Sequence, residues 1–366
     1  MATDRDGQNH APEFPEAEPV VKPGEFVFAA AHFDHGHIYG QIGGLVTYGG
    51  KLKYVYDPNP ERYEKVLAEH PGCKVARDLD EILQDPEVHL VTTAAIPCER
   101  GPIGLRVMEA GKDYFTDKAP FTTLDQLADA RAAVAKTGRK YMVSYSERLL
   151  NEAAYYAGEL IRDGVIGRVL QVVNLAPHNL AAHTRPDWFF KKECYGGILT
   201  DIGSHQFEQF LHYAGASSAE INHARVENFE NPDWPGLEDF GEALLTTDTG
   251  ASCYCRVDWF NPGGSRTWGD GRTFVLGTRG SIEIRKYIDL ARDTGGGLLF
   301  LVDDKSEQEI PCQGRVGFPY YGQLILDVLN RTEQAMTQEH AFKAAELSMQ
   351  AQAIADRQRR KQSVSV

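Results

Sequence analysis

The sequence has no hydrophobic run of the length that a membrane-spanning helix needs, about 18 apolar residues. Its first residues, MATDRDGQNHAPEFPEAEPVVKPGE, also lack the apolar core of a secretory signal. They are polar and rich in proline and glutamate. Residues 1–24 are therefore expected to form either a disordered tail or an arm packed on a partner subunit, and we favour the tail. We expect a cytoplasmic protein without a membrane partner.

Positive charge and cysteine are also scarce. The 38 Lys and Arg residues face 52 Asp and Glu residues, which gives a net charge of −14 at pH 7. Such a chain is a poor electrostatic partner for nucleic acid, so we expect no nucleic-acid partner. The six cysteines are scattered and none forms a CxxC pair. This pattern argues against a zinc site built from cysteines and favours reduced thiols in a cytoplasmic protein.

What the chain does contain is the composition of a soluble globular protein, with 42% apolar and 25% charged residues. Its 366 residues suffice for two ordinary domains. Over residues 25–147, strand-like runs such as EFVFAAA, KLKYVYD and VHLVTTAA alternate with helix-like segments. Repeated βα units of this kind predict a doubly wound parallel sheet, that is, a Rossmann domain that binds a dinucleotide.

The pattern changes over residues 148–366. A helix-like segment runs from Leu199, and strand-like runs such as ASCYCRVDWF, RTFVLGTRG and SIEIRKYIDL then follow closely. The tight turns TDTG and GTRG predict antiparallel neighbours, and two helices close the chain. The second domain is expected to be α+β with a large, mainly antiparallel open sheet, so the fold class is α/β.

The first βα turn, AAAHFDHGHIYG, is where a ligand is expected first, because open α/β sheets bind ligands at the carboxyl ends of their strands. The dinucleotide fingerprint GxGxxG would place glycines at 31, 33 and 36, and only Gly36 is one. Ala31 is still small enough for a tight turn. The helix that begins near Gly36 can offer N–H groups to a phosphate.

Asp57 ends the second strand, about 20 residues after this turn, where dinucleotide-binding domains carry the acid that binds ribose. A carboxylate there suits the ribose hydroxyls of NAD and repels the extra phosphate of NADP. NAD is therefore the expected cofactor, and NADP is less favoured. The other interpretation is that Asp57 caps the next helix through the turn DPNP.

The histidines of HFDHGH have a spacing that could ligate zinc or iron, although such a site would need ligands from elsewhere in the chain. They could instead make polar contacts with the cofactor, or hold the turn. We favour polar contacts with the cofactor and expect no metal.

Three further segments carry a family resemblance. EAGKDYFTDKAP resembles the AGKHV…EKP segment of the Gfo/Idh/MocA oxidoreductases and places Lys118 at the family's lysine. YGGILTDIGSHQFE resembles GGGxxxDxGxHxxD and places Asp201 and His205 at its acid and histidine. The segment from Arg148 resembles the crossing out of the nucleotide domain. The chain departs from these motifs in DKAP and at Tyr195.

The resemblance implies a hydride-transfer site at the joint of the two domains. Oxidising a secondary alcohol removes a hydride from carbon and a proton from oxygen, so it needs a base and a cation near the oxygen. We expect His205 to be the base, Lys118 to lie by the nicotinamide and the substrate oxygen, and Asp201 to orient a hydroxyl or tune Lys118. Gly203 would allow a close approach, unless this is only an ordinary first helical turn.

The other candidate residues are assigned by position. Substrate contacts are expected from the segment APHNLAAHTRPDWFF, which is otherwise a surface loop. Glu147 ends the last nucleotide-domain strand near the expected nicotinamide. The substrate candidates are His178, His183, Arg185 and Trp188. The cofactor candidates are Phe33, Asp34, His35, Gly36, His37, Asp57, Ala94, Arg100, Lys118 and Arg148.

The expected function is NAD-dependent oxidation of a ring hydroxyl of a sugar, glycoside or cyclitol. The resemblance also implies a homo-oligomer, a dimer or tetramer, formed through the C-terminal sheet. Three alternatives stay open: an enzyme that retains and recycles NAD during elimination, epimerisation or glycoside cleavage; a non-catalytic protein that binds NAD or sugar; and a metal-dependent hydrolase built on the histidine cluster.

Overall fold

The computed structural model describes residues 14–292 and 295–364. This part of the chain divides into two compact units. The first comprises the described residues up to Ser144 together with 317–341, and the second comprises 145–316 and the residues from 342 onward. The first break lies close to the expected domain boundary at 147, whereas the segment 317–341 joins the first unit. Among the described helices, none is both long and apolar enough to cross a membrane.

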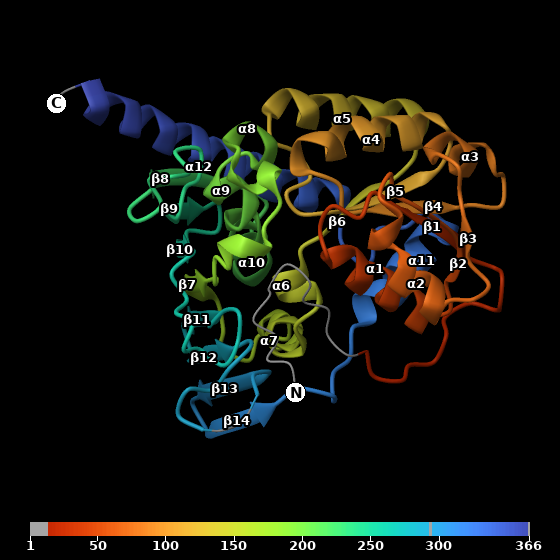
Figure 1. The fold of residues 1–366 in the computed structure, drawn as a ribbon. Helices are drawn as coiled ribbons and strands as arrows, with labels where there is room; N and C mark the ends of the chain where they lie inside the picture. The colour runs from red at the N-terminus through yellow and green to blue at the C-terminus, as the bar shows by residue number, and fades with distance from the viewer. Residues whose placement is uncertain (1–13, 293–294, 365–366) are drawn as a thin grey trace. The chain divides into compact units, whose positions relative to one another are not determined.

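The first unit contains a six-stranded sheet in the order β3-β2-β1-β4-β5-β6, with all neighbours parallel (Figure 1). This order is that of a Rossmann domain, which confirms the predicted doubly wound sheet. The strands are β1 (Val27–Ala31), β2 (Lys51–Tyr56), β3 (Lys74–Val75), β4 (Leu90–Thr93), β5 (Asp113–Asp117) and β6 (Tyr141–Ser144).

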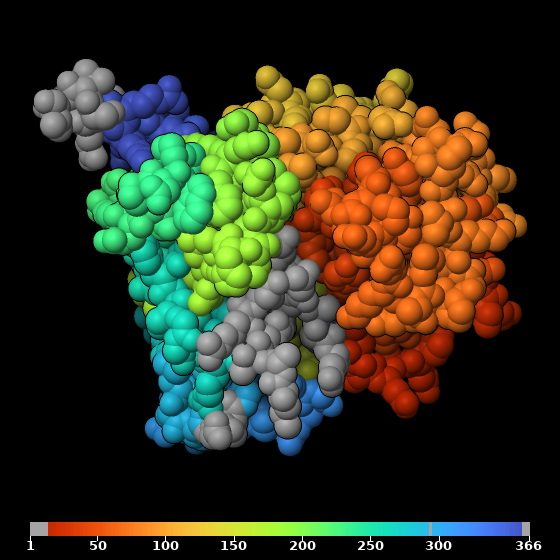
Figure 2. Space-filling model, in the orientation of Figure 1, coloured from red at the N-terminus to blue at the C-terminus, as the bar shows by residue number. Residues whose placement is uncertain are grey.

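Helices cover both faces of this sheet. α4 and α5 lie side by side over one face, in the golden region at the top of Figure 2. α1 packs with α11 on the other face. The helices are α1 (His37–Thr47), the 3-10 helix η2 (Pro60–Arg62), α2 (Glu64–Glu69), α3 (Leu79–Gln84), α4 (Pro97–Glu109), α5 (Leu124–Thr137) and α11 (Pro319–Asn330).

Helix ends in the first unit follow the expected cap chemistry. The Thr123 side chain accepts a hydrogen bond from the backbone N–H of Gln126, and Gly138 ends α5 with φ +63°. The Asn59 side chain accepts from the N–H of Glu61 and caps η2. The apolar period of NPERYEKVLAEH predicts a single helix, but the chain breaks at Tyr63 into η2 and α2.

The N-terminal segment expected to be a tail is described only from residue 14. There the ring of Phe14 packs edge-on against Phe318 and Tyr321, with centroid distances of 5.1 and 6.0 Å. The backbone N–H of Val20 donates to the carbonyl of Tyr48. Residues 14–24 are thus held on the first unit by aromatic packing and a backbone hydrogen bond. Residues 1–13 lie outside the described part of the chain.

The second unit contains an eight-stranded sheet in the order β14-β13-β12-β11-β7-β10-β9-β8. Only β7 and β10 are parallel neighbours, which confirms the mainly antiparallel sheet. The turns TDTG and GTRG join antiparallel pairs as predicted. The strands are β7 (Val169–Pro177), β8 (Ala219–Glu227), β9 (Phe240–Thr247), β10 (Ser252–Asp258), β11 (Arg272–Gly277), β12 (Gly280–Arg285), β13 (Leu298–Asp303) and β14 (Glu307–Pro311).

Helices of the second unit pack on one face of this sheet, with α10 against β7 and β10 and α7 against β12 (Figure 1). The helix expected from Leu199 is two helices, because α9 ends at Asp201 and α10 begins at Gly203. The helices are α6 (Ser146–Leu149), α7 (Glu152–Arg162), η3 (Ala182–Thr184), η4 (Asp187–Phe190), α8 (Lys192–Tyr195), α9 (Ile198–Asp201), α10 (Gly203–Ala214) and α12 (Gln338–Val364).

Candidate active site

Backbone hydrogen bonds from the ends of β2 and β4 hold the first βα turn. His32, next to Ala31, has φ +58°, and its N–H donates to the carbonyl of Tyr56. The N–H of His35 donates to the carbonyl of Ala94, whose own N–H donates to the carbonyl of His32. α1 begins after Gly36 at the carboxyl edge of the sheet, and the N–H groups of Ile38 and Tyr39 donate to the carbonyls of His35 and Gly36. The positive end of the helix dipole therefore lies at this edge.

Asp57 is buried beneath this turn, and its carboxylate accepts hydrogen bonds from the backbone there. One carboxylate oxygen accepts from the N–H of Phe33 at 2.6 Å, and the other accepts from the N–H of Asn59 at 2.8 Å. The guanidinium of Arg62 lies 3.4 Å from Asp57 and 2.6 Å from Asp34. The helix cap proposed for Asp57 belongs instead to Asn59. Asp57 therefore shapes the turn, with a cation beside it.

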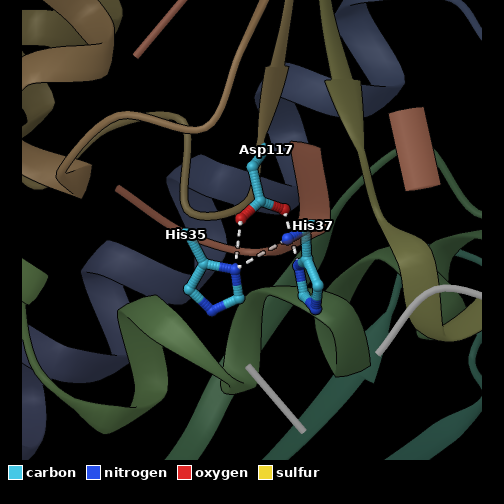
Figure 3. A group of neighbouring side chains, drawn as sticks. All are labelled: His35, His37 and Asp117. Atoms are coloured by element: carbon cyan, nitrogen blue, oxygen red, sulfur yellow. Dashed lines mark hydrogen bonds and ion pairs between the residues drawn. The ribbon is translucent and has the colours of Figure 1, made fainter. Parts of the chain in front are cut away.

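Asp117, at the end of β5, gathers the polar side chains of the turn (Figure 3). One oxygen lies 3.0 Å from Nδ1 of His37, and the other lies 3.6 Å from Nδ1 of His35. The guanidinium of Arg100 donates to this second oxygen at 3.2 Å. Burial alone would raise the pKa of Asp117, but the charges of His37 and Arg100 hold it far below its ordinary value.

Burial determines the protonation state of His35 in this cluster. Burial, followed by the charge of neighbouring His37, lowers the pKa of His35 well below 6.5. His35 is therefore neutral at pH 7, and its Nδ1 accepts from the backbone N–H of His37 at 3.3 Å. The cluster thus places a fixed carboxylate, a neutral imidazole and a buried guanidinium at the start of α1.

The same three side chains have the composition of a metal site. The ligand atoms of His35, His37 and Asp117 all lie within 4.8 Å of one another. However, Arg100 already neutralises the carboxylate, and Lys118 follows it in the chain. A divalent ion would place further positive charge in this buried site, where like charges repel strongly. The charges fit an ion-paired hydrogen-bond cluster better than a metal site.

Lys118 follows β5 in the first unit and is buried. The carbonyls of Lys118 and Ala119 both accept from the guanidinium of Arg100, and the peptide bond between these two residues is cis. The predicted cofactor residues of this unit, from Phe33 to Lys118, therefore gather at the carboxyl edge of its sheet.

Asp201 and His205 lie in the second unit, on either side of the break between α9 and α10, and both are buried. The His205 ring lies edge-on to Tyr145, with a centroid distance of 6.3 Å. A methyl group added at Gly203 would lie 3.4 Å from the nearest atom, which is ordinary contact. Packing within this unit therefore does not explain the glycine, and the predicted close approach stays a prediction.

Arg148, the remaining cofactor candidate, lies on α6 in the second unit. Its Nε donates to both carboxylate oxygens of buried Glu208, at 2.9 and 3.0 Å. This ion pair joins α6 to α10. A contact between Arg148 and the cofactor stays a prediction.

Two of the four substrate candidates meet at Trp259. The ring of His178 lies 5.5 Å from Trp259 and 4.6 Å from Trp268. The guanidinium of Arg185 lies 5.3 Å from the Trp259 ring, a cation–π contact. Trp188 packs on Phe189, which in turn contacts Trp259, whereas His183 is exposed on η3.

Comparison with protein families matches both units. Residues 29–145 match the oxidoreductase family with an NAD-binding Rossmann fold, and residues 155–283 match the GFO/IDH/MocA C-terminal domain. The chain belongs to the Gfo/Idh/MocA family.

Curated relatives of this Gfo/Idh/MocA protein include dehydrogenases of polyols and sugars. The scyllo-inositol 2-dehydrogenase (NAD(+)) of Bacillus subtilis strain 168 is 29% identical over 64% of this chain and 66% of its own length. The D-xylose dehydrogenase of Paenarthrobacter nicotinovorans is 26% identical over 40% of this chain and 39% of its own length. The chain thus matches just under two thirds of the length of the first relative and well under half of the second.

Solved structures of related fold extend over most of the chain. A proposed oxidoreductase of Erwinia carotovora atroseptica SCRI1043 is 42% identical, with a TM-score of 0.87, over 90% of this chain and 99% of that one. Levoglucosan dehydrogenase in complex with NADH and levoglucosan has a TM-score of 0.74 at 18% identity, over 90% of this chain and 96% of that one. The second likeness concerns the fold alone.

The sequence analysis did not predict a buried ion pair in the second unit of this Gfo/Idh/MocA protein. Glu147 at the start of α6 pairs with Lys286, whose Nζ lies 2.9 Å from Glu147 Oε2. Lys286 lies two residues after Ile284 and continues the inward-facing series of Ile282 and Ile284 in β12. The two-residue period of a strand therefore predicts that it is buried. A lysine in such a series needs a buried partner, and this requirement was the available signal.

Proposed function

We propose that this protein is an NAD-dependent oxidoreductase that oxidises a secondary ring hydroxyl of a sugar, glycoside or cyclitol. The observation that carries the proposal is the buried lysine at the motif position, Lys118, which follows β5 at the carboxyl edge of a domain of the NAD-binding Rossmann family. The relatives named as inositol and xylose dehydrogenases supply the substrate class.

The residues divide the proton chemistry between them. NAD, when bound, supplies the acceptor for the hydride. The imidazole of His205 accepts the hydroxyl proton, since an ordinary histidine titrates near neutral pH. The ammonium group of Lys118 favours the developing negative charge on the substrate oxygen. Asp201 orients the hydroxyl.

The first unit offers the features that a dinucleotide requires. The start of α1 at Gly36, the positive end of the helix dipole, would receive the pyrophosphate. Asp57 would face the adenosine ribose, and its charge opposes the 2′-phosphate of NADP. Arg62 weakens that opposition, but its own charge is shared with Asp34 and Asp57. These contacts favour NAD over NADP.

For the substrate, the aromatic group around Trp259 supports binding of a ring with an apolar C–H face. His178 and Arg185 bring hydrogen-bonding groups to this aromatic group. Trp188 Nε1 is a buried donor without a hydrogen-bond partner among the described residues, which suits a hydroxyl acceptor. His183 is a weaker candidate because it is exposed.

The function is tested by a panel of sugars and cyclitols, with NADH formation followed by absorbance. Lys118→Ala and His205→Ala are expected to lower kcat/KM by at least about 100-fold, the usual contribution of one acid–base group. Circular dichroism should show both variants folded. Turnover close to wild type in either variant would remove that residue from the proton chemistry.

A further inference from the structure

Glu147 is a buried carboxylate that none of the motif matches explains. Its exposed fraction is 3%, and it lies at the start of α6. Burial of an ionised carboxylate costs several kcal/mol unless other groups compensate it. The groups that surround Glu147 therefore indicate the role of its negative charge.

One oxygen of Glu147 is fully used. Oε2 accepts from the ammonium group of Lys286 and from the side-chain amide of Gln206, both at 2.9 Å. Lys286 also donates to Gln209 at 2.8 Å, and its carbonyl accepts from the amide of Asn151. Contacts with α6, α7 and α10 thus fix the carboxylate and its cation in place.

The other oxygen of Glu147 accepts no hydrogen bond from the described residues. This oxygen, Oε1, is buried and lies 4.0 Å from Nε2 of His178. His205 precedes Gln206 on α10, and its ring lies edge-on to that of Tyr145, two residues before Glu147, with a centroid distance of 6.3 Å. The Oε1 atom of Glu147 is therefore held beside His178, where the start of α6 meets the first turn of α10.

We propose that Glu147 is a positioning residue that supplies the buried counter-charge for the protonated imidazole of His205, and that Lys286 keeps this carboxylate ionised. The proposal deepens the proposed function and rests on it, because it concerns the proton that His205 accepts. An imidazolium buried on α10 has lost its solvation, and a fixed carboxylate nearby replaces part of it.

The charge of Glu147 is stable over the working pH range. Burial alone would raise the pKa of Glu147, but Lys286, His205 and His178 hold it well below its ordinary value. Cys255 and Tyr213 are neutral because burial raises their pKa values. The groups of the second unit that bear on the two side chains are Asp201, Lys286, His178, Cys255, Tyr213, Tyr287 and the Arg148–Glu208 pair.

The experiment compares Glu147→Gln, Lys286→Met and the double variant in the full chain. The pKa of His205 is measured by NMR of ¹³C-labelled histidine without ligands, with its signal assigned by its loss in His205→Ala. Glu147→Gln is expected to lower this pKa by about one unit, since an opposite charge is lost. Lys286→Met is expected to lower it as well, because the buried carboxylate loses the cation that keeps it ionised, and the double variant is expected to add no further shift.

Turnover provides the second readout. Since neutral His205 is the active form, both Glu147→Gln and Lys286→Met should move the acidic limb of the kcat profile to lower pH. An unchanged His205 pKa in the folded single variants would overturn the proposal. If Glu147→Gln does not fold, Lys286→Met tests the proposal alone: a lower His205 pKa supports it, and an unchanged or higher one overturns it. If the pKa shifts but His205→Ala keeps its turnover, the charge coupling stands and the proposed base is wrong.

Discussion

At the scale of single residues, charged side chains at the carboxyl edge of the first unit's sheet combine a structural role with the role proposed for them in cofactor binding. Asp57 holds the first βα turn through the N–H of Phe33 and also provides the negative charge at the expected ribose position. Arg62 balances that charge and that of Asp34. At the proposed ribose site, we therefore expect the choice between NAD and NADP to depend on the balance of two acids and one guanidinium, rather than on one acid.

Asp57→Asn tests this balance. The amide oxygen can still accept from the backbone of the turn, but the charge that repels a 2′-phosphate is lost, so Arg62 is less fully neutralised. We expect the ratio of kcat/KM for NADP to that for NAD to rise by about 10-fold, equivalent to roughly 1.4 kcal/mol. Asp80→Asn, at an exposed pair with Arg106, is the control. An unchanged ratio would remove Asp57 from cofactor selection.

At the scale of elements, a glycine sets how closely α1 and α11 approach. A methyl group at Gly44 would lie 2.6 Å from ring carbons of Tyr321, closer than such atoms pack. Gly44→Ala should therefore lower the free energy of unfolding by about 1–3 kcal/mol, the usual cost of overpacking a core. Chemical denaturation measures it. Gly72→Ala, where no atom lies within 4 Å, should cost little, and equal stabilities would contradict the packing argument.

Element types were predictable because period and cap chemistry are local. A threonine cap and a stop glycine, Thr123 and Gly138, bound α5 in agreement with local capping rules, and the βα order defined the parallel sheet. The breaks at Tyr63 and Ile202 were not predicted, because an apolar period continues across both. β14 was missed because its sequence, EQEIP, is short and polar, and pairing with β13 alone makes it a strand.

The candidate site was predictable only in part for the same reason. Motif spacing singled out Lys118, Asp201 and His205 as candidates, but partners distant in the sequence decide what a charged group does. Asp57 contacts Phe33, Arg148 pairs with Glu208, and Glu147 pairs with Lys286. Such pairs form when the chain folds, and one sequence alone does not pair them.

At the scale of the whole molecule, the eight-stranded sheet has one face covered by helices of its own unit. Side chains that alternate with the buried ones point away from those helices. Phe274 and Leu276 on β11 are 38% and 48% exposed, and Leu244 and Val302 on neighbouring parts of the sheet are also exposed. An apolar strip of this kind favours burial against another surface. We propose that a second copy of the chain covers it.

Leu276→Glu tests the oligomer that this face would form. A carboxylate placed in an apolar interface loses its solvation without gaining a partner, so the variant should dissociate. Light scattering after size exclusion should give a multiple of 40.7 kDa for the wild type and a value near 40.7 kDa for the variant. Leu290→Glu makes the same change at a leucine that is 60% exposed and outside the strands, and should keep the wild-type mass. A monomeric wild type, or a variant that keeps the wild-type mass, would show that this face is not the contact between copies.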